Sequence, residues 1–500
     1  MQQLNLFEYN WDNDEYIIEN FSANGLCQES ARIAIEKRYT PILEVTNKFD
    51  RQIVSYQLNK HNPLHSWLKY KEGFSAELVS ILLEEMNISK GSTILDPFMG
   101  SGTTSLVCQM NNINSIGYDI MPFSEIAINA KSNVLNYDIS EITSIIEEFS
   151  AIKMPESYSK KISYVTITKS AYPEFNEKFI QFATDWISES HYSNEIKNLF
   201  ILCILNSLER CSYTAKDGQY LRWDSRSLKV INSNNERQQM GRKIISPHFC
   251  RDIIENIQDT IIQELHHVLL DIKFIQNNFK DKFSATVHFQ KCSALLELPK
   301  LDDSTIDGVI TSPPYCNRYD YTRIYALELA YLGLNDNDIK NLRQCLISCT
   351  VESISKLSLL KEYYNSINAS NRFNYILNHV QSNNSFKEVM MALNLRKNHG
   401  DLNNNGVIKM IDGYFSELAF VFAELHRICK KGAIVAVVND NVRYGGEIIP
   451  VDFISTSLAE QFGFTPVKIY CLRQQKGNSS QQMKKFGRVA LRKSITLWKK

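Results

Sequence analysis

The stretch from residue 92 to residue 120 limits the possible folds more than any other part of the sequence. It reads "STILDPFMGSGTTSLVCQM", an apolar segment, a glycine-rich turn and a helical segment, and a second apolar segment, "SIGYDI", follows soon after. This order predicts a strand, a helix and a second, parallel strand. Asp119 ends the second strand, 23 positions after Asp96, a spacing that places an acid near the ribose hydroxyls of a bound nucleoside. We therefore expect a nucleoside-containing ligand at this edge of the sheet.

The glycine-rich turn does not match the two common phosphate-binding loops. A P-loop needs a lysine before its Ser or Thr, and none precedes Thr103 or Thr104. A dinucleotide-binding turn needs a third glycine, which is missing after Gly100 and Gly102. Asp96, directly before the turn, would repel a pyrophosphate but suits a ligand that carries an ammonium group. The turn therefore favours a positively charged ligand.

Strand-like and helix-like segments continue to alternate along the chain. Residues 138–283 are mainly helical, and one apolar stripe at helical spacing consists of Ile254, Ile257, Ile261, Leu265, Val268 and Ile272. Strand patterns return near 285–296 and 306–311, whereas residues 335–406, rich in Asn and Ser, are expected to be irregular. A helix that ends near Gly432, the strand "AIVAVVND", another helix and two strands complete the pattern. The predicted fold is α/β: a doubly wound, mostly parallel Rossmann-like sheet with a large helical insertion.

Polar residues follow five of the predicted strands, in the segments "DPF", "GYDI", "KCS", "SPPY" and "VND". Ligands of such sheets collect at the carboxyl ends of the strands, so these segments are expected to share one crevice. In "ITSPPYC" two prolines end a strand, because proline has no N–H for the sheet. The Ser312 hydroxyl and the outward carbonyl of Pro313, stiffened by Pro314, then form two acceptors at fixed spacing for an exocyclic amino group. The ring of Tyr315 can stack on a planar base.

The net charge of the 500 residues is zero, but the charges are unevenly distributed. Residues 1–31 hold six acids and no base, and residues 484–500 hold seven bases and no acid. Residues 210–243 hold eight bases against three acids, with aromatic residues between them. Either basic run could be a solvated face, but both are candidates for contact with a nucleic acid. The residues chosen as DNA contacts are Arg222, Arg226, Lys484 and Lys485.

Several other classes of protein are disfavoured. The longest apolar runs are much shorter than the ~20 residues of a membrane-spanning helix, and the acidic start does not resemble a signal peptide. The eleven cysteines form no CxxC pair and no cluster with histidine. We therefore expect a cytoplasmic protein with no membrane segment and no metal.

The segments "DPFMGSGTT" and "TSPPY" resemble the cofactor loop and the catalytic motif of the S-adenosyl-L-methionine (AdoMet)-dependent DNA amino-methyltransferases. These enzymes methylate N4 of cytosine or N6 of adenine. The resemblance implies a methyltransferase core made of residues 61–137, 284–334 and 407–500. The other parts are an acidic N-terminal segment (1–60), a helical insertion expected to be the target-recognition region (138–283) and a second insertion (335–406).

The resemblance also implies site residues. Asp96 corresponds to the acid at the amino group of AdoMet, and Asp119, followed by Ile120, to the acid at its ribose. The preceding helix motif, residues 65–79, supplies Lys71 and Phe74. The residues of the loop that approach the ligand are Pro97, Phe98, Gly100, Ser101, Gly102, Thr103 and Thr104. The residues of the catalytic motif are Ser312, Pro313, Pro314 and Tyr315.

Two positions depart from the commonest family pattern. The acid that often contacts the adenine of the cofactor is replaced by Ser293. The catalytic motif begins with serine rather than aspartate, and the serine form is more typical of the enzymes that act on cytosine N4. The sequence thus favours cytosine N4 and leaves adenine N6 open.

Two other functions stay open. One is an amine methyltransferase that acts on RNA or protein, and the other is a nucleic-acid-binding module that binds AdoMet without catalysis. A carbon-5 cytosine methyltransferase is disfavoured, because that chemistry needs a cysteine directly after proline and Cys316 follows Tyr315. The expected partner is double-stranded DNA with its target base flipped out of the helix. A cognate restriction endonuclease, in a restriction-modification system, is a further expected partner.

Overall fold

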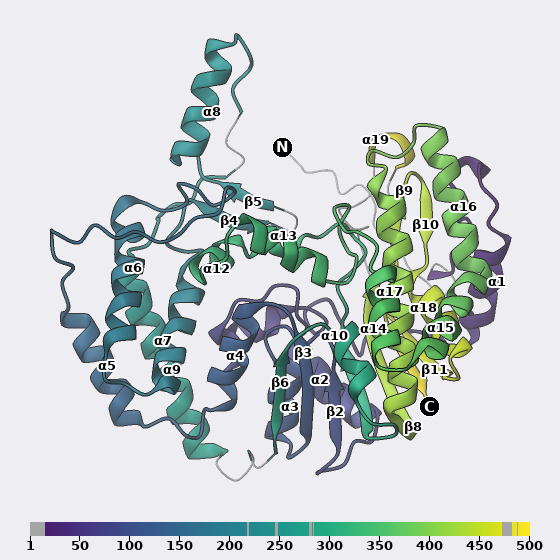
Figure 1. The fold of residues 1–500 in the computed structure, drawn as a ribbon, viewed down its shortest axis with the longest axis horizontal. Helices are drawn as coiled ribbons and strands as arrows, with labels where there is room; N and C mark the ends of the chain where they lie inside the picture. Colours follow the sequence, from purple (N-terminus) through teal and green to yellow (C-terminus); the bar gives the residue numbers. More distant parts are fainter. Residues whose placement is uncertain are drawn as a thin grey trace.

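The computed structural model describes residues 16–217, 220–245, 249–279, 283, 285–472, 483–487 and 489–500. An eight-stranded sheet crosses the molecule in the order β1-β11-β12-β8-β7-β2-β3-β6 (Figure 1). Its strands are β1 (Leu43–Thr46), β2 (Thr93–Asp96), β3 (Asn114–Asp119), β6 (Val287–Lys291), β7 (Ile306–Thr311), β8 (Cys429–Asp440), β11 (Thr465–Leu472) and β12 (Lys493–Lys499). Only β12 pairs antiparallel with its neighbours, so the predicted doubly wound, mostly parallel sheet is confirmed.

The sheet has a switch point between β2 and β7. From β2 the chain passes through α3 (Thr103–Met110) to β3 and then to β6 at one edge, and it returns to β7 on the other side of β2. Connections that leave two adjacent strands in opposite directions open a crevice at the carboxyl ends of those strands. The ends of β2 and β7 carry the two sequence motifs, so the topology alone brings these motifs together.

Alternation along the central strands divides the core into two layers, because successive side chains of a strand point to opposite faces. Ile94 of β2 and Ile310 of β7 lie in a cluster with residues of α2 (Ala76–Glu85) and α3. Leu95 and Val309, one position away, lie in a second cluster with residues of α17 (Gly406–Ile428) and α18 (Val451–Gln461). The buried layers on both faces keep the strand ends fixed.

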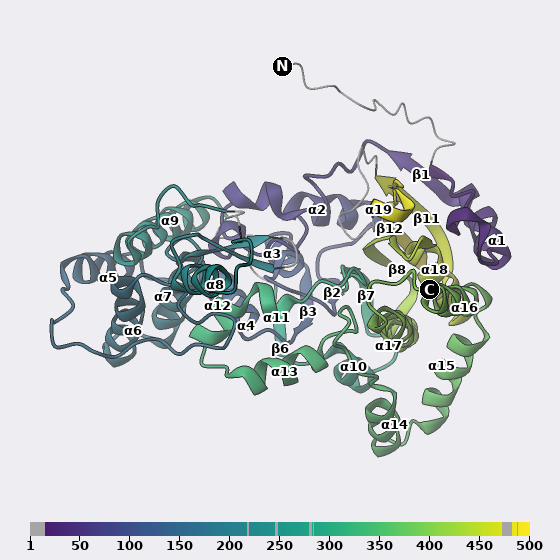
Figure 2. The same ribbon diagram turned by 90° about the horizontal axis from the view of Figure 1, so that it is seen from above.

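The insertion is mainly helical, as predicted, and it lies beside the sheet at the β6 edge (Figures 1 and 2). The apolar stripe forms the buried side of its last helix from Ile257 to Ile272, although Ile254 precedes that helix. A two-stranded antiparallel sheet within the insertion had no clear signal in the sequence. The elements of the insertion are α5 (Ile139–Ala151), α6 (Glu174–Glu189), α7 (Asn194–Ser207), β4 (Thr214–Asp217), β5 (Tyr220–Trp223), α8 (Leu228–Gln239) and α9 (Ile257–Asn278), and α4 (Pro122–Ser132) precedes it in the core.

The expectation of irregular structure across residues 335–406 is wrong, because four helices form there. Several of the Asn residues cap these helices or are exposed on them. Asn335 forms a capping box with Asp338, and Asn383 caps the last of the four. Apolar residues at helical spacing, such as Phe373 and Ile376, are buried. The helices are α13 (Asp336–Cys345), α14 (Leu357–Ser366), α15 (Ser370–Ser382) and α16 (Asn384–Asn398).

The described residues of the N-terminal segment join the core. β1 pairs in parallel with β11 at the edge of the sheet. Arg32 of α1 (Ser30–Tyr39) forms buried ion pairs with Glu388 and Glu447, and Glu36 pairs with Arg492. Buried ion pairs of this kind are costly to break from one side, so this segment is firmly attached.

The remaining elements are short. They are α10 (Ala294–Glu297), α11 (Tyr321–Ile324), α12 (Ala326–Tyr331), β9 (Val442–Tyr444), β10 (Glu447–Ile449), α19 (Met483–Phe486) and the 3₁₀ turns Ala23–Gly25, Thr40–Ile42, Tyr56–His61, His65–Trp67 and Leu298–Lys300. Within the described part of the chain, we find no helix with the length and apolar character needed to span a membrane.

Candidate active site

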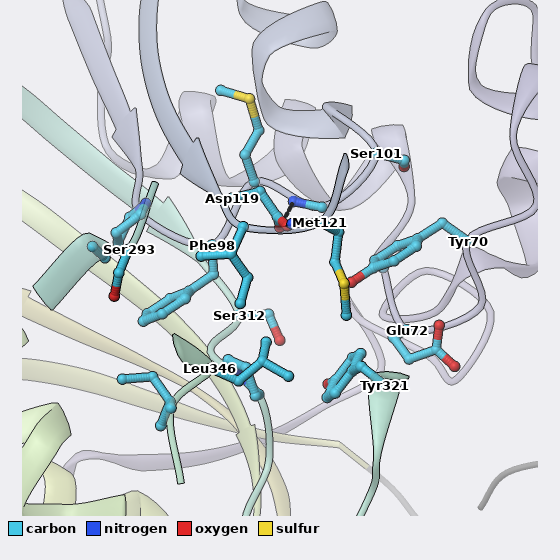
Figure 3. Close-up of a pocket in the computed structure, with 18 of the residues that line it drawn as sticks. Tyr70, Glu72, Phe98, Ser101, Asp119, Met121, Ser293, Ser312, Tyr321 and Leu346 are labelled. Atoms are coloured by element: carbon cyan, nitrogen blue, oxygen red, sulfur yellow. Dashed lines mark hydrogen bonds between the residues drawn. The ribbon is translucent and has the colours of Figure 1, made fainter. Parts of the chain in front are cut away.

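A cavity opens at the carboxyl ends of β2, β3, β6 and β7 (Figure 3), where ligands of doubly wound sheets bind. Four of the five polar strand ends predicted to share a crevice contribute to it. The predicted site residues in its wall are Phe74, Pro97, Phe98, Gly100, Ser101, Thr103, Asp119, Ile120, Ser293, Ser312 and Pro314. The cofactor loop and the catalytic motif thus face one space.

The glycine-rich loop needs its first glycine for both conformation and space. Gly100 has φ +56°, in the left-handed region, and a Cβ there would lie 2.7 Å from Cε1 of Tyr70. The N–H of Gly100 donates to Oδ2 of Asp119, with 2.9 Å between the two atoms (dashed line in Figure 3). The loop is therefore held against the wall of the cavity by the acid that ends β3.

Asp119 is the only carboxylate at the end of β3. Its second oxygen, Oδ1, accepts the N–H of Met121 at 2.8 Å. Burial raises the pKa of Asp119 to about 6, and the backbone hydrogen bonds from Met121 and Gly100 oppose that rise. Each carboxylate oxygen has a further lone pair, so the group keeps the capacity to accept hydrogen bonds from hydroxyls in the cavity.

Asp96 lies behind the cavity wall and joins the two motifs. Its Oδ2 accepts the hydroxyl of Thr104 at 2.6 Å, and its Oδ1 accepts the hydroxyl of Thr311 at 2.7 Å and the N–H of Phe98 at 3.1 Å. Burial raises its pKa to about 6, although these hydrogen bonds favour the charged form. A contact between Asp96 and the amino group of AdoMet stays a prediction. Its hydrogen bonds to both motifs are a structural role that the sequence did not reveal.

The catalytic motif follows directly from the end of β7 at Thr311, as the two prolines predicted. The Ser312 hydroxyl lies 3.2 Å from Oη of Tyr315 and 3.3 Å from the carbonyl oxygen of Val438. Ser312 and Pro314 line the cavity, whereas Pro313 and Tyr315 are not part of its wall in this conformation. The hydroxyl of Tyr315 thus lies beside Ser312. The contact between its ring and a base stays a prediction.

A lysine that the sequence analysis did not select lies beside Tyr315. Nζ of Lys493 is 5.4 Å from the centre of the Tyr315 ring and 3.7 Å from Oδ1 of Asp440. Burial raises the pKa of Tyr315, and the positive charge of Lys493 opposes this. The cation is 178 positions from Tyr315 along the chain, so only the antiparallel pairing of β12 with β8 could have revealed it.

The residues before α2 differ from the prediction in one respect. Phe74 lines the cavity, but Lys71 does not, and its Nζ donates to the carbonyl of Lys216 at 2.7 Å. Tyr70 and Glu72, on either side of Lys71, line the cavity instead (Figure 3). The only signal in the sequence for Tyr70 and Glu72 is their position next to the predicted contact Lys71.

Two further walls of the cavity come from distant segments. Tyr321 of α11 faces the space near Ser312, and Leu346 follows α13 (Figure 3). The carboxylate of Glu72 accepts hydrogen bonds from the hydroxyls of Tyr319 and Tyr325. Segments on both sides of the sheet therefore close the cavity. Two predicted loop residues, Gly102 and Thr104, lie behind its wall.

The predicted DNA contacts have different environments. Arg222 is exposed on β5. The guanidinium of Arg226 is held by both oxygens of Asp224, at 2.9 and 2.7 Å. Lys485 is an exposed lysine that pairs with Asp401, and the side chain of Lys484 lies outside the described residues. All four DNA contacts remain predictions.

Comparison with known proteins gives the class of the molecule. Residues 23–129 match the family described as N6/N4 DNA methylase. The chain belongs to this family and is an AdoMet-dependent DNA methyltransferase, which confirms the predicted family, enzyme class and cofactor.

Individual relatives extend along almost the whole chain. It is 51% identical to the type II methyltransferase M.BsoBI of Geobacillus stearothermophilus over 487 residues, 97% of this chain and 95% of the relative. It is 35% identical to the type II methyltransferase M.AvaI of a Nostoc species over 493 residues, 96% of this chain and 95% of the relative. M.MjaII of Methanocaldococcus jannaschii is 25% identical over 407 residues, 67% of this chain and 72% of the relative. The likeness therefore includes both insertions.

Proposed function

We propose that this methyltransferase modifies the exocyclic amine of a base flipped out of double-stranded DNA, with N4 of cytosine as the favoured target. The observation that carries this proposal is that Ser312 and Pro314 line the same cavity as the glycine-rich loop and Asp119. A methyl donor bound along the loop and an amine held at Ser312 would then be neighbours. Adenine N6 is the alternative target.

The residues that line the cavity suit AdoMet. Asp119 can accept hydrogen bonds from ribose hydroxyls, and Phe74 and Phe98 offer flat apolar surfaces. Gly100, whose missing Cβ leaves room for the ring of Tyr70, lets the loop backbone form part of the cavity wall. Bound AdoMet would supply a methyl group activated by its sulfonium. We assign the binding of the cofactor to these residues, to the neighbouring loop residues and, for its adenine, to Ser293.

The residues of the catalytic motif would hold the target amine. The hydroxyl of Ser312 can donate to the Val438 carbonyl, which leaves its lone pairs free to accept a hydrogen of the amine. The Pro313 carbonyl is the second acceptor in this proposal. Two acceptors at fixed spacing would orient the nitrogen lone pair toward the methyl group, so most of the catalysis would come from position and electrostatics. A rotation of Tyr315 toward the cavity would place its ring against the flipped base.

The preference for cytosine rests on the serine that begins the motif, Ser312. The decisive experiment is mass spectrometry of the nucleosides from duplex DNA incubated with the enzyme and AdoMet. We expect N4-methylcytosine. N6-methyladenine would establish the alternative target, and the absence of both would reject the proposal. Ser312→Ala, which keeps the loop intact, is the matched control for background methylation.

We further infer a role as the modification enzyme of a restriction-modification system in the cytoplasm, because the relatives described above are named type II methyltransferases. A cognate endonuclease would cut the same DNA word. Digestion of methylated and unmethylated plasmid tests this: an endonuclease that cuts the word should cleave only the unmethylated DNA. Cleavage of both would show that the methylated base lies outside the word of that nuclease.

A further inference from the structure

The most exposed element of the described chain is α8, the helix of the insertion that extends beyond the body of the molecule (Figure 1). None of its residues is buried. Its apolar residues Leu228 and Ile231 are 60% and 41% exposed. A 12-residue helix is marginally stable alone, so a helix that packs so little on its own protein has the features of one that meets a partner.

The helix is firmly attached at its root. Ser227 caps its first turn, with Oγ accepting the N–H of Val230. Directly before the cap, Asp224 accepts hydrogen bonds from the Arg226 guanidinium and from the N–H of Arg251 at 2.7 Å. The helix therefore leaves the hairpin of β4 and β5 in a defined direction.

That hairpin is in turn bound to the wall of the active site. Nζ of Lys216, on β4, pairs with the carboxylate of Glu328 on α12, and both groups are buried. The carbonyl of Lys216 accepts the Nζ of Lys71, whose neighbours Tyr70 and Glu72 line the cavity. The hairpin at the root of α8 is thus linked to the site by a short chain of polar contacts, of which the Lys216–Glu328 pair is buried.

One side of α8 is covered by the segment that returns from it. The amide of Asn234 brackets the backbone of Ile245, accepting its N–H at 2.8 Å and donating to its carbonyl at 3.3 Å. Nε of Arg237 donates to the carbonyl of Lys243 at 2.8 Å. On the opposite side, spaced three and four positions apart, lie the exposed side chains of Asn232, Asn235 and Gln239.

The charge and chemistry of this arm, residues 225–245, point to nucleic acid. The arm holds five bases and one acid, in a chain whose net charge is zero. Arg242 and Lys243 lie at its exposed tip. Such a positive projection attracts phosphates. An α-helix fits the major groove of B-DNA, and Asn and Gln amides can pair with the adenine N6 and N7 atoms there.

We propose that α8 enters the major groove of the DNA beside the flipped base. Asn232, Asn235 and Gln239 hydrogen-bond to base edges, and Arg242 and Lys243 contact phosphates. This inference deepens the proposed function and rests on DNA as the substrate. It assigns sequence reading to one exposed side of one helix within the larger insertion.

The test compares methylated words. The enzyme and AdoMet modify a library of random DNA duplexes, and sequencing that detects methylated bases gives the recognised word. For the variant with Asn232→Ala, Asn235→Ala and Gln239→Ala, we expect kcat/KM on the original word to fall at least about 100-fold. We also expect the word to become degenerate at one or more positions. AdoMet affinity and the melting temperature should not change.

The matched control lies on α15, where Asn371, Asn374 and Asn378 repeat the same spacing on an exposed side. Their triple alanine variant should methylate the original word like the unmodified enzyme. A second variant, Arg242→Ala with Lys243→Ala, should leave the word unchanged. It should lower the slope of log affinity against log salt by about 2, since each phosphate contact contributes about 0.9.

The outcomes separate this inference from the proposed function. If the amide variant keeps both the word and the rate, or loses rate equally on every word, then α8 does not read bases and the inference is overturned. If the unmodified enzyme methylates no DNA, the proposed function fails first, and no difference between variants is needed to show it.

Discussion

The cavity at the switch point and the α8 arm differ in how far their residues are buried and held in place. The cavity is built from strand ends and a glycine-rich loop, where Asp96 is buried, Asp119 is half-buried, and both are hydrogen-bonded to neighbours that the sheet fixes in place. The arm consists mainly of α8, which has no buried residue, and it is held at its root, where Ser227 is buried. Chemistry at one atom needs rigid, dry surroundings, whereas reading a DNA word needs side chains that reach outward. The difference indicates that the two proposed tasks, methyl transfer and reading of the DNA word, belong to separate parts of the chain that are linked by few contacts.

The largest effect is expected from Asp96→Ala, which would break the cavity side of the comparison. It removes the acceptor shared by Thr104 and Thr311 and leaves buried hydroxyls without their partner. We expect AdoMet binding to be lost and the free energy of unfolding to fall by about 1 to 3 kcal/mol. Calorimetric titration with AdoMet and urea unfolding measure the two losses. Normal AdoMet affinity would show that Asp96 neither binds the ligand nor supports the loop.

A smaller loss of turnover is expected from Lys493→Met. The cation beside Tyr315 and Asp440 would be gone, so the tyrosine next to Ser312 would be less well placed. We expect kcat to fall about 10-fold, in the range of a lost positioning contact, with AdoMet affinity unchanged. Lys499→Met, at the exposed far end of β12, is the control. Equal kcat in both variants would show that Lys493 does not contribute to catalysis.

Asp119→Asn tests how the charge of the Asp119 carboxylate affects the free energy of unfolding. Because burial raises the pKa of Asp119 to about 6, from an ordinary value near 4, the folded protein binds this proton more tightly than the unfolded chain. The stability that the proton supplies is complete below about pH 4 and is lost as the pH rises through about 6. The stability of Asp119→Asn relative to the unmodified protein, measured without AdoMet, should therefore improve by about 1 to 3 kcal/mol between low pH and pH 7. A constant cost is added to this at every pH, because the amide NH2 faces one of the two N–H groups, of Gly100 and Met121, that the carboxylate accepts.

The pH-dependent part of this difference should disappear below about pH 4, where the carboxyl group becomes protonated in both states. Urea unfolding at several pH values between 4 and 7 measures it. A difference that does not depend on pH would mean that the carboxyl group titrates normally. The same variant should bind AdoMet more weakly, because its amide offers one acceptor oxygen in place of two.

The smallest effect is expected on the arm side, from single charges. Arg222→Ala should lower the salt slope of DNA binding by about 0.9 if Arg222 contacts one phosphate. Lys485→Ala serves as a comparison, since this lysine is paired with Asp401 far from the arm. Fluorescence anisotropy of labelled duplex at several salt concentrations measures both slopes. A larger change in the salt slope for Lys485→Ala than for Arg222→Ala would place the DNA-binding surface near Lys485 and not on the arm side.

The local sequence predicts the cavity better than its surroundings. The glycine-rich loop, Asp119 and the catalytic motif are adjacent to their own strands, so strand ends and topology suffice to bring them together. Lys71 was misplaced because its partner, the carbonyl of Lys216, comes from a hairpin 145 positions later. Lys493 was missed for the same reason, since Asp440 lies on β8 and Tyr315 follows the end of β7, both far from Lys493 along the chain.

The second insertion shows a different limit. Its Asn and Ser residues favour loops by composition, yet Asn335 and Asn383 act as helix caps, and the four helices pack through apolar residues that the composition concealed. Composition alone does not separate a capping asparagine from a loop asparagine. The position of the cap relative to the apolar stripe would have been the better signal.

The central claim is that the loop and the catalytic motif divide two tasks within one cavity. Ser312→Ala tests it most directly, with the AdoMet dissociation constant and the single-turnover rate of methyl transfer to duplex DNA measured on the same preparation. We predict a dissociation constant within about 3-fold of the unmodified enzyme and a rate at least about 100-fold lower, as for the loss of a polar group at a reacting centre. An unchanged rate, or an equal loss of cofactor affinity and rate, would contradict the account.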